Sequence, residues 1–247
     1  MTRAVSVAML GVALACFDSG GTGPRLIGAG RRALFIGNSY LYAQDIPGIV
    51  QALADSAGGD RIAVETIASP DFALVDHWST HDANAEIVKG GWEWIILQQG
   101  PSSVEVNRDT LRMAARLFAD LMARGKATPA LFSAWPQSDR LQDFPRAIES
   151  YTLAASDVNG VLLPVASAWL GAWSRDPSIN LYLDGLHPSV EGAYLSALVV
   201  YGRLLGKKTA GLPATLRLNS GVTIAITASR AALLQAAADS ANTATPQ

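Results

Sequence analysis

Two short segments, far apart in the chain, carry the residue types that nucleophilic catalysis by a hydroxyl group requires. In the first, Phe35-Ile-Gly-Asn-Ser-Tyr40, Ser39 follows a short apolar run. A serine hydroxyl is a weak nucleophile until a neighbouring base takes its proton in the transition state. The second segment offers such a base in His187 and, three residues earlier, a carboxylate in Asp184. That spacing allows Asp184 to hold one imidazole nitrogen while the other faces a nucleophile.

The elements that must position these segments alternate between strand and helix along the chain. Short apolar runs typical of buried strands cover 33–37, 92–98, 129–135 and 161–165, and residues 61–68 alternate as a strand does. Helical patterns cover 46–57, 72–88, 111–121, 144–156 and 188–205. Five strands separated by helices indicate an α/β fold, a parallel sheet with helices on both faces. In such sheets the reacting groups lie outside the carboxyl ends of the strands, where both segments are expected.

Each segment alone has an ordinary explanation, since Gly-Asn-Ser turns are common and Asp184 could cap the following helix. Together they resemble a known family. Leu34-Phe-Ile-Gly-Asn-Ser-Tyr40 resembles the first sequence block of the SGNH (GDSL-like) hydrolases, and Asp184-x-x-His187-Pro188 resembles their last block. The resemblance spans residues 33–205 and implies a flavodoxin-like, three-layer α/β/α fold with about five parallel strands. It further implies ester hydrolysis without a cofactor, through an acyl-serine at Ser39, with His187 as general base and Asp184 as its orienter.

The same resemblance predicts an oxyanion hole, where the match is looser. SGNH hydrolases combine the nucleophile's backbone N–H (here Ser39), a backbone N–H from a glycine in a second block, and an Asn side chain from a third. Asp71 stands where the glycine is expected, and its carboxylate would oppose an oxyanion unless it turns away. The third block holds no Asn; Gln99 before Gly100 resembles an arrangement in some carbohydrate-ester members, with Gln98 as the competing donor. Alternatively, both glutamines bond the loop backbone.

Aromatic and histidine side chains add two weaker hypotheses. Tyr40 beside the nucleophile and Trp135 at the end of a predicted strand are candidates for substrate binding, with a sugar ring stacked on Trp135, although tryptophans at strand ends more often pack in the core. His77 and His81 have the i, i+4 spacing of helical metal ligands. No H-E-x-x-H pattern accompanies them, so no metal site is expected.

The N-terminus has the pattern of an export signal. Arg3 precedes an apolar run, 4–15, that is too short to cross a bilayer, which takes about 20 residues. Ala13-Leu-Ala15 is a cleavage pattern, and Cys16 after it resembles the lipidated cysteine of bacterial lipoproteins, although Ala13 replaces the usual Leu. The alternative is plain cleavage and secretion. We therefore expect a signal peptide at 1–15, a flexible tether at 16–30, and a protein that is either attached to a membrane through a lipidated Cys16, in the periplasm or on the cell surface, or freely secreted.

The remainder of the chain is expected to form one hydrolase domain, 31–208, and an extension, 209–247, packed on it. The extension should hold a hairpin at 216–226, a helix at 228–238 and a frayed end at 240–247. A formal net charge of -2 gives no basic stripe, so nucleic acid is not an expected partner.

Three functions fit these patterns. The leading hypothesis is an exported serine esterase acting on O-acyl esters of a small molecule or a glycan, with glycan O-acetyl groups as the candidate substrate. The second is a lipase or thioesterase-like hydrolase of longer acyl chains. The third, motivated by Asp71 and the missing Asn, is a non-catalytic surface lipoprotein that keeps the fold to bind glycans.

Overall fold

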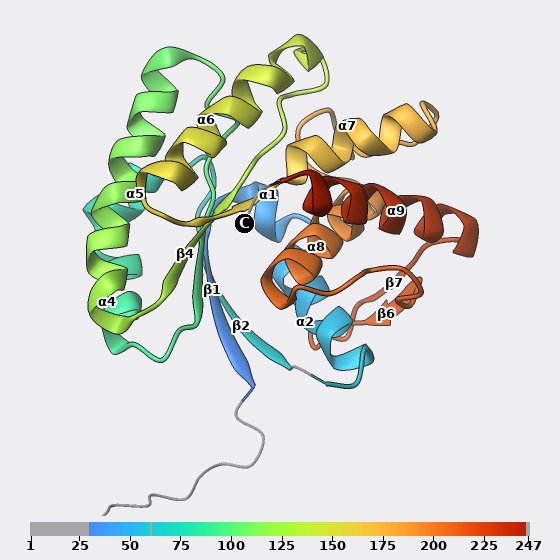
Figure 1. The fold of residues 1–247 in the computed structure, drawn as a ribbon, viewed down its shortest axis with the longest axis horizontal. Helices are drawn as coiled ribbons and strands as arrows, with labels where there is room; N and C mark the ends of the chain where they lie inside the picture. The colour runs from blue at the N-terminus through green and yellow to red at the C-terminus, as the bar shows by residue number, and fades with distance from the viewer. Residues whose placement is uncertain (1–29, 60, 246–247) are drawn as a thin grey trace, which may run out of the picture.

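The computed structural model describes residues 30–59 and 61–245, and its centre is a parallel sheet with the strand order β2-β1-β3-β4-β5 (Figure 1). The strands are β1 (Arg31–Gly37), β2 (Ile62–Ala68), β3 (Trp94–Leu97), β4 (Thr128–Phe132) and β5 (Val161–Leu163). All residues of β3 and the last five of β1 are buried, as expected for strands covered on both faces. This is the flavodoxin-like order, which confirms the predicted fold.

Helices cover the two faces of the sheet and complete the three layers (Figure 1). One layer holds α3 (Leu74–Thr80), α4 (Asp82–Lys89), α5 (Glu105–Gly125) and α6 (Phe144–Asp157), with the short helix η1 (Leu141–Asp143) before α6. The other holds α2 (Ile46–Ser56), α7 (Val165–Arg175), α8 (Val190–Leu205) and α9 (Ala228–Ala244). The one-turn helix α1 (Ser39–Tyr42) follows β1 at its carboxyl end.

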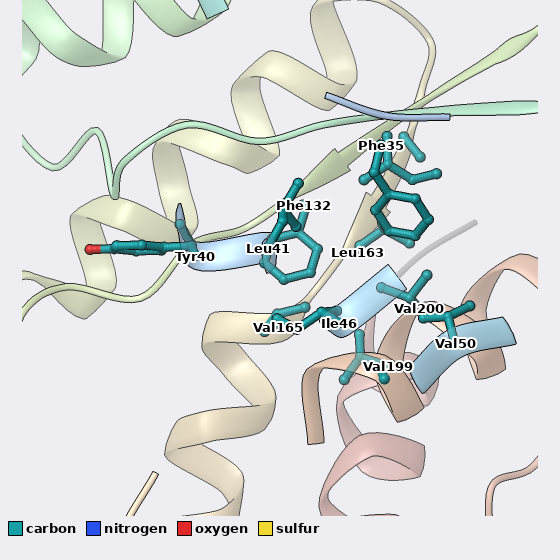
Figure 2. Close-up of a cluster of buried hydrophobic side chains, with 14 of the residues drawn as sticks. Phe35, Tyr40, Leu41, Ile46, Val50, Phe132, Leu163, Val165, Val199 and Val200 are labelled. Atoms are coloured by element: carbon teal, nitrogen blue, oxygen red, sulfur yellow. The ribbon is translucent and has the colours of Figure 1, made fainter. Parts of the chain in front are cut away.

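A buried cluster of hydrophobic side chains fixes α1 against the sheet and its second helical layer (Figure 2). Leu41 of α1 is fully buried in it, beside side chains of β1, β4, β5 and the second layer; the labelled members include Phe35, Ile46, Val50, Phe132, Leu163, Val165, Val199 and Val200. Burying one such side chain contributes about 1.5–3 kcal/mol. The first helix, and with it Ser39, is therefore held by the core.

Several elements differ from the sequence-based expectations. Strands β3 and β4 end at Leu97 and Phe132, earlier than predicted. Helix α7 was not predicted, because Val165 was interpreted as the end of a strand. The helix expected over 72–88 is two helices, since His81 adopts a left-handed backbone conformation with φ 64°.

The last core helix also begins later than predicted. Ser189 is its N-cap, and the Ser189 hydroxyl accepts a hydrogen bond from the Gly192 N–H at 3.1 Å. Pro188, expected to open the helix, instead forms an isolated antiparallel bridge with Tyr182. The residues before α8 are thus part of a closed loop.

The C-terminal region contains the predicted hairpin, formed by the antiparallel strands β6 (Thr215–Arg217) and β7 (Thr223–Ala225). The helix predicted over 228–238 is longer: α9 reaches Ala244, so residues 240–244 are helical rather than frayed, and it packs against α7 and α8. The predicted signal peptide (1–15), Cys16 and all but the last residue of the predicted tether lie outside the described residues. No helix in the described ranges has the length and apolar character needed to span a membrane.

Candidate active site

Ser39 lies at the point where β1 gives way to α1. Asn38 is the N-cap of that helix, and its side-chain Oδ1 accepts a hydrogen bond from the Tyr40 N–H at 3.2 Å. Gly37 precedes it, and a Cβ there would collide with the side chain of Gln98. The half-buried Ser39 side chain therefore lies at the carboxyl end of the sheet, held there by Gly37, the Asn38 cap and the buried helix α1. Parallel α/β folds bind their ligands at this end of the sheet.

Asp184 and His187 lie on a tight loop that the Tyr182–Pro188 bridge closes. The Leu183 N–H donates to the His187 carbonyl oxygen at 2.9 Å. Gly185, at the tip, has φ 86°, and a Cβ there would lie 2.8 Å from the Ser138 hydroxyl. This position therefore needs glycine for both its backbone angle and its lack of a side chain.

The loop brings both side chains to Ser39. His187 Nε2 lies 2.9 Å from Ser39 Oγ, and His187 Nδ1 lies 2.7 Å from Asp184 Oδ2. Asp184 Oδ1 also accepts the backbone N–H groups of His187 (2.7 Å) and Leu186 (3.0 Å). The hydrogen bond from His187, followed by these two N–H groups, lowers the pKa of Asp184 to about 2. Asp184 is a carboxylate at neutral pH, so His187 can keep Nδ1 protonated and offer Nε2 as a base.

A cleft of about 410 Å³ opens beside Ser39. Its wall combines hydroxyl, amide and charged side chains with apolar ones in similar measure. The polar lining residues are Asn38, Ser39, Asp71, Gln99, Ser102, Ser103, Asn107, Thr110, Gln137, Arg140 and Asp143. The cleft therefore presents many hydrogen-bonding groups to a ligand.

Two of the backbone N–H groups at this cleft, those of Ser39 and Asp71, have no acceptor within the described part of the chain. Asp71 lies in the turn after β2 with φ 59°, the left-handed conformation that glycine adopts easily and Asp tolerates better than most residues. Free N–H groups beside a nucleophile are the usual donors to a developing oxyanion.

The two glutamines after β3 do not supply a further free donor, which corrects the expectation for Gln99. Its Nε2 donates to the Ser102 hydroxyl at 2.8 Å and the Asn107 carbonyl oxygen at 3.4 Å. Gln98 Nε2 likewise donates to Asn38 Oδ1 at 3.0 Å and to the carbonyl oxygen of Gln99 at 2.7 Å. Both protons of each amide are used inside the protein, because each side chain is almost fully buried.

Trp135 is also placed differently from the expectation. It is 0% exposed and does not line the cleft, so it offers no face for a sugar ring. Its ring stacks between Tyr40 (centroids 5.0 Å apart) and Trp169 (4.0 Å), and its Nε1–H donates to the Leu186 carbonyl oxygen at 3.0 Å. Trp135 thereby supports the loop that carries His187.

Tyr40 does reach the cleft, although only 4% of it is exposed. In Figure 2 its hydroxyl points away from the hydrophobic cluster. Burial, with a smaller contribution from the Asp184 charge, raises the pKa of the Tyr40 phenol well above its ordinary value. Tyr40 can therefore act as a neutral hydrogen-bonding group.

The two histidines of the 72–88 segment do not share a helix face. His77 is 1% exposed, and its Nε2–H donates to the Gly37 carbonyl oxygen at 2.7 Å, whereas His81 is exposed between α3 and α4. Burial lowers the pKa of His77, which keeps the ring neutral. Among residues 30–59 and 61–245, no group of three or more His, Cys, Asp or Glu is arranged to hold a metal ion.

Sequence reasoning missed the supporting part of Asn38 and His77. An Asn before a predicted helix is an N-cap signal, so Asn38 could have been found. His77 carried no such signal, because it lies on α3 and its partner, the Gly37 carbonyl, lies on β1, far away in the sequence.

Comparison with solved structures finds the same fold in known proteins. A protein described as an SGNH hydrolase from Slackia heliotrinireducens superposes with a TM-score of 0.56 at 20% identity, covering 71% of this chain and 99% of its own. A lipase/acylhydrolase from Enterococcus faecalis gives a TM-score of 0.58 at 13% identity (71% and 96%). A catalytic mutant of an acetylxylan esterase from Geobacillus stearothermophilus gives 0.52 at 15% identity (73% and 94%). No protein-family model and no curated protein matches the chain.

The chain has the fold of the SGNH hydrolases. Within that fold, Ser39, Asp184 and His187 stand in hydrogen-bond contact at the carboxyl end of the sheet, in the order that the sequence resemblance implied.

Proposed function

We propose that the protein is a serine-dependent hydrolase of carboxylic esters. The observation that carries this proposal is the chain of contacts from Ser39 Oγ through His187 to Asp184, with 2.9 Å and 2.7 Å between the polar atoms. Such a chain is the arrangement that activates a serine hydroxyl. Its position beside a cleft where the N–H groups of Ser39 and Asp71 are free supports the proposal further.

In the proposed reaction, Ser39 Oγ attacks the ester carbonyl carbon while its proton passes to His187 Nε2. The carbonyl oxygen becomes an oxyanion and accepts the N–H groups of Ser39 and Asp71. Collapse releases the alcohol, which takes the proton from His187, and leaves an acyl-serine. Water then repeats the sequence: His187 takes its proton, the acid leaves, and Ser39 regains its hydrogen. Asp184 stays ionised throughout and stabilises the imidazolium.

For the substrate, we infer a short acyl group, with acetyl as the candidate, on a polar alcohol such as a glycan hydroxyl. The polar side chains in the cleft wall support this, because hydroxyl, amide and guanidinium groups can bond to sugar hydroxyls. The similarity to a protein named as an acetylxylan esterase supports it as well.

The test is a comparison of p-nitrophenyl acetate, butyrate, octanoate and palmitate, together with acetylated xylo-oligosaccharides, using the native protein and Ser39→Ala. We expect fast turnover of acetyl esters that falls with chain length, and a loss of at least ~10³-fold in Ser39→Ala. Preference for octanoate or palmitate would favour a lipase instead. Equal, background-level turnover by both proteins, with glycan binding retained, would favour a non-catalytic binding protein.

We also propose that the protein is exported, either lipidated at Cys16 or released after cleavage before it. The positively charged start, the short apolar run and the Ala13-Leu-Ala15 pattern support this. Expression in a bacterium with the native N-terminus, followed by intact-mass measurement, tests it. A cytoplasmic product that retains residues 1–15 would rule out export.

A further inference from the structure

Gln98 and Gln99 are consecutive glutamines at the end of β3 with 0% and 3% of their surface exposed. A buried amide is costly unless each of its donors and acceptors is bonded. Neither side chain reaches a ligand with a free proton, so their role must lie in the protein partners that they hold.

Gln98 holds the residue before the nucleophile. Its Oε1 accepts the Asn38 backbone N–H at 2.9 Å, and its Nε2 donates to Asn38 Oδ1 at 3.0 Å. Asn38 Oδ1 in turn accepts the Tyr40 N–H. The N–H groups on both sides of Ser39 are thus engaged within the protein, which leaves the Ser39 N–H as the free one of the three.

Gln99 holds the other side of the cleft. Its Oε1 accepts the N–H of Leu74, the first residue of α3, at 3.1 Å. The turn containing Asp71 lies just before α3, and Asn38 Nδ2 ties that turn to β1 by donating to the Phe72 carbonyl oxygen at 3.0 Å. Gln99 thus fixes the C-terminal side of the Asp71 turn, and Gln98 acts on the same turn through Asn38.

We propose that Gln98 and Gln99 are positioning residues: a buried glutamine brace that sets the directions of the Ser39 and Asp71 backbone N–H groups. This inference rests on the esterase function proposed above. Donors stabilise an oxyanion only when they already point at its position, because reorienting them during the reaction consumes the benefit. A satisfied buried network is well suited to hold them. It also explains why Gly37 lacks a side chain, since a Cβ would displace the Gln98 amide.

The experiment replaces each glutamine by methionine, which has a similar length and no amide. Gln235→Met is the matched control: Gln235 is a buried glutamine of α9, 4% exposed, whose amide bonds to Tyr194, Gly211 and Leu212. Thermal unfolding, kcat and KM for p-nitrophenyl acetate, and the affinity for phenylboronic acid are measured for all three. Phenylboronic acid forms a B–O bond with the serine oxygen and so mimics the tetrahedral intermediate.

We expect Gln98→Met and Gln99→Met to lose kcat by about 10- to 10²-fold, less than the ~10²–10³-fold that complete removal of one oxyanion donor costs, because the N–H groups are misdirected rather than removed. KM should change little, and boronate affinity should fall with kcat. Gln235→Met should lose thermal stability but keep kcat within about 2-fold, since a stability effect alone does not redirect N–H groups. If either Gln98→Met or Gln99→Met fails to fold, the other variant provides the same test.

The proposed brace is wrong if folded Gln98→Met and Gln99→Met keep the kcat and boronate affinity of Gln235→Met. It is also wrong if only KM changes, because that result assigns the glutamines to substrate binding. Failure of the proposed function gives a different result, in which the native protein turns over no faster than Ser39→Ala. In that case the backbone amide NMR signals of Ser39 and Asp71 test the brace. Their chemical shifts should change in Gln98→Met and in Gln99→Met but not in Gln235→Met. Unchanged shifts in the first two variants would overturn the brace.

Discussion

Replacing Trp135 by phenylalanine tests whether this residue is a buried support of the His187 loop or a surface that binds sugars. The indole is fully buried, and its N–H is the hydrogen-bond donor to the Leu186 carbonyl, one residue before His187. Phenylalanine keeps an aromatic ring between Tyr40 and Trp169 but removes that donor and part of the ring. The variant therefore perturbs the loop of the base without replacing any residue that lines the cleft.

The expected magnitude follows from these two losses. An unsatisfied carbonyl costs about 1–3 kcal/mol, and incomplete filling of the indole site adds about 1–2 kcal/mol, so unfolding should become about 2–5 kcal/mol easier. A shift of the His187 ring by even a fraction of an ångström weakens its contact with Ser39, and misplacement by about 1 Å costs up to ~10²-fold in rate. We expect kcat to fall by about 10- to 10²-fold and KM to change by less than about 2-fold.

Urea unfolding and steady-state kinetics with p-nitrophenyl acetate and acetylated xylo-oligosaccharides measure these effects. Trp94→Phe is the control, because Trp94 is also nearly buried (7% exposed) but lies at the amino end of β3, beside Arg31 and far along the sheet from Ser39. It should change stability and leave kcat alone. If Trp135→Phe instead keeps its stability and kcat while KM rises only for the oligosaccharide, Trp135 is a sugar platform and the support argument is wrong.

Three further predictions concern the reacting groups. His187→Ala should cost about as much kcat as Ser39→Ala, and Asp184→Asn should retain more activity; a silent Asp184→Asn in the same kinetic assay would mean that another acid orients His187. Asp71→Gly should keep or modestly raise kcat, because glycine adopts φ 59° freely and removes a carboxylate from the cleft; loss of activity would give Asp71 a role beyond its N–H. The Asp184 pKa is lowered to about 2 from 3.8, so its contribution to stability is present above pH 3.8 and is lost as pH falls toward 2. Acid unfolding of Asp184→Asn should lack that component, and identical pH profiles would contradict it.

The sheet could be predicted from the sequence because its signals are local. Four of the five sheet strands are short apolar runs and β2 alternates, and the alternation of strands with helices leaves few arrangements for a parallel sheet. The errors fall where a local pattern has two meanings. Val165 continues an apolar run but is the first residue of α7, and Pro188 resembles a helix start but pairs with Tyr182 across a loop.

In the candidate site, too, contacts that depend on local sequence or on the topology of the fold could be predicted, and other contacts between distant elements could not. Asp184 and His187 are three residues apart on one loop, so their spacing alone allowed the contact that the structure contains. Ser39 meets them because strand ends converge in this fold, a property of the topology rather than of any side chain. The sequence resemblance was therefore sufficient to predict that Ser39, His187 and Asp184 lie in contact.

The surroundings of Ser39 depend instead on contacts between elements that no short pattern records. Trp135 was expected at the rim because it follows a strand, but α7, which the sequence analysis missed, brings Trp169 against its face and buries it. Gln99 was expected to face the ligand, but the start of α3 lies where its amide can accept the Leu74 N–H, and that bond turns it into the protein. In both cases the sequence analysis placed the residue near the active site correctly but assigned it the wrong role. What decided each role was which buried donor or acceptor lay within 3.1 Å of the side chain, and burial makes such a bond obligatory.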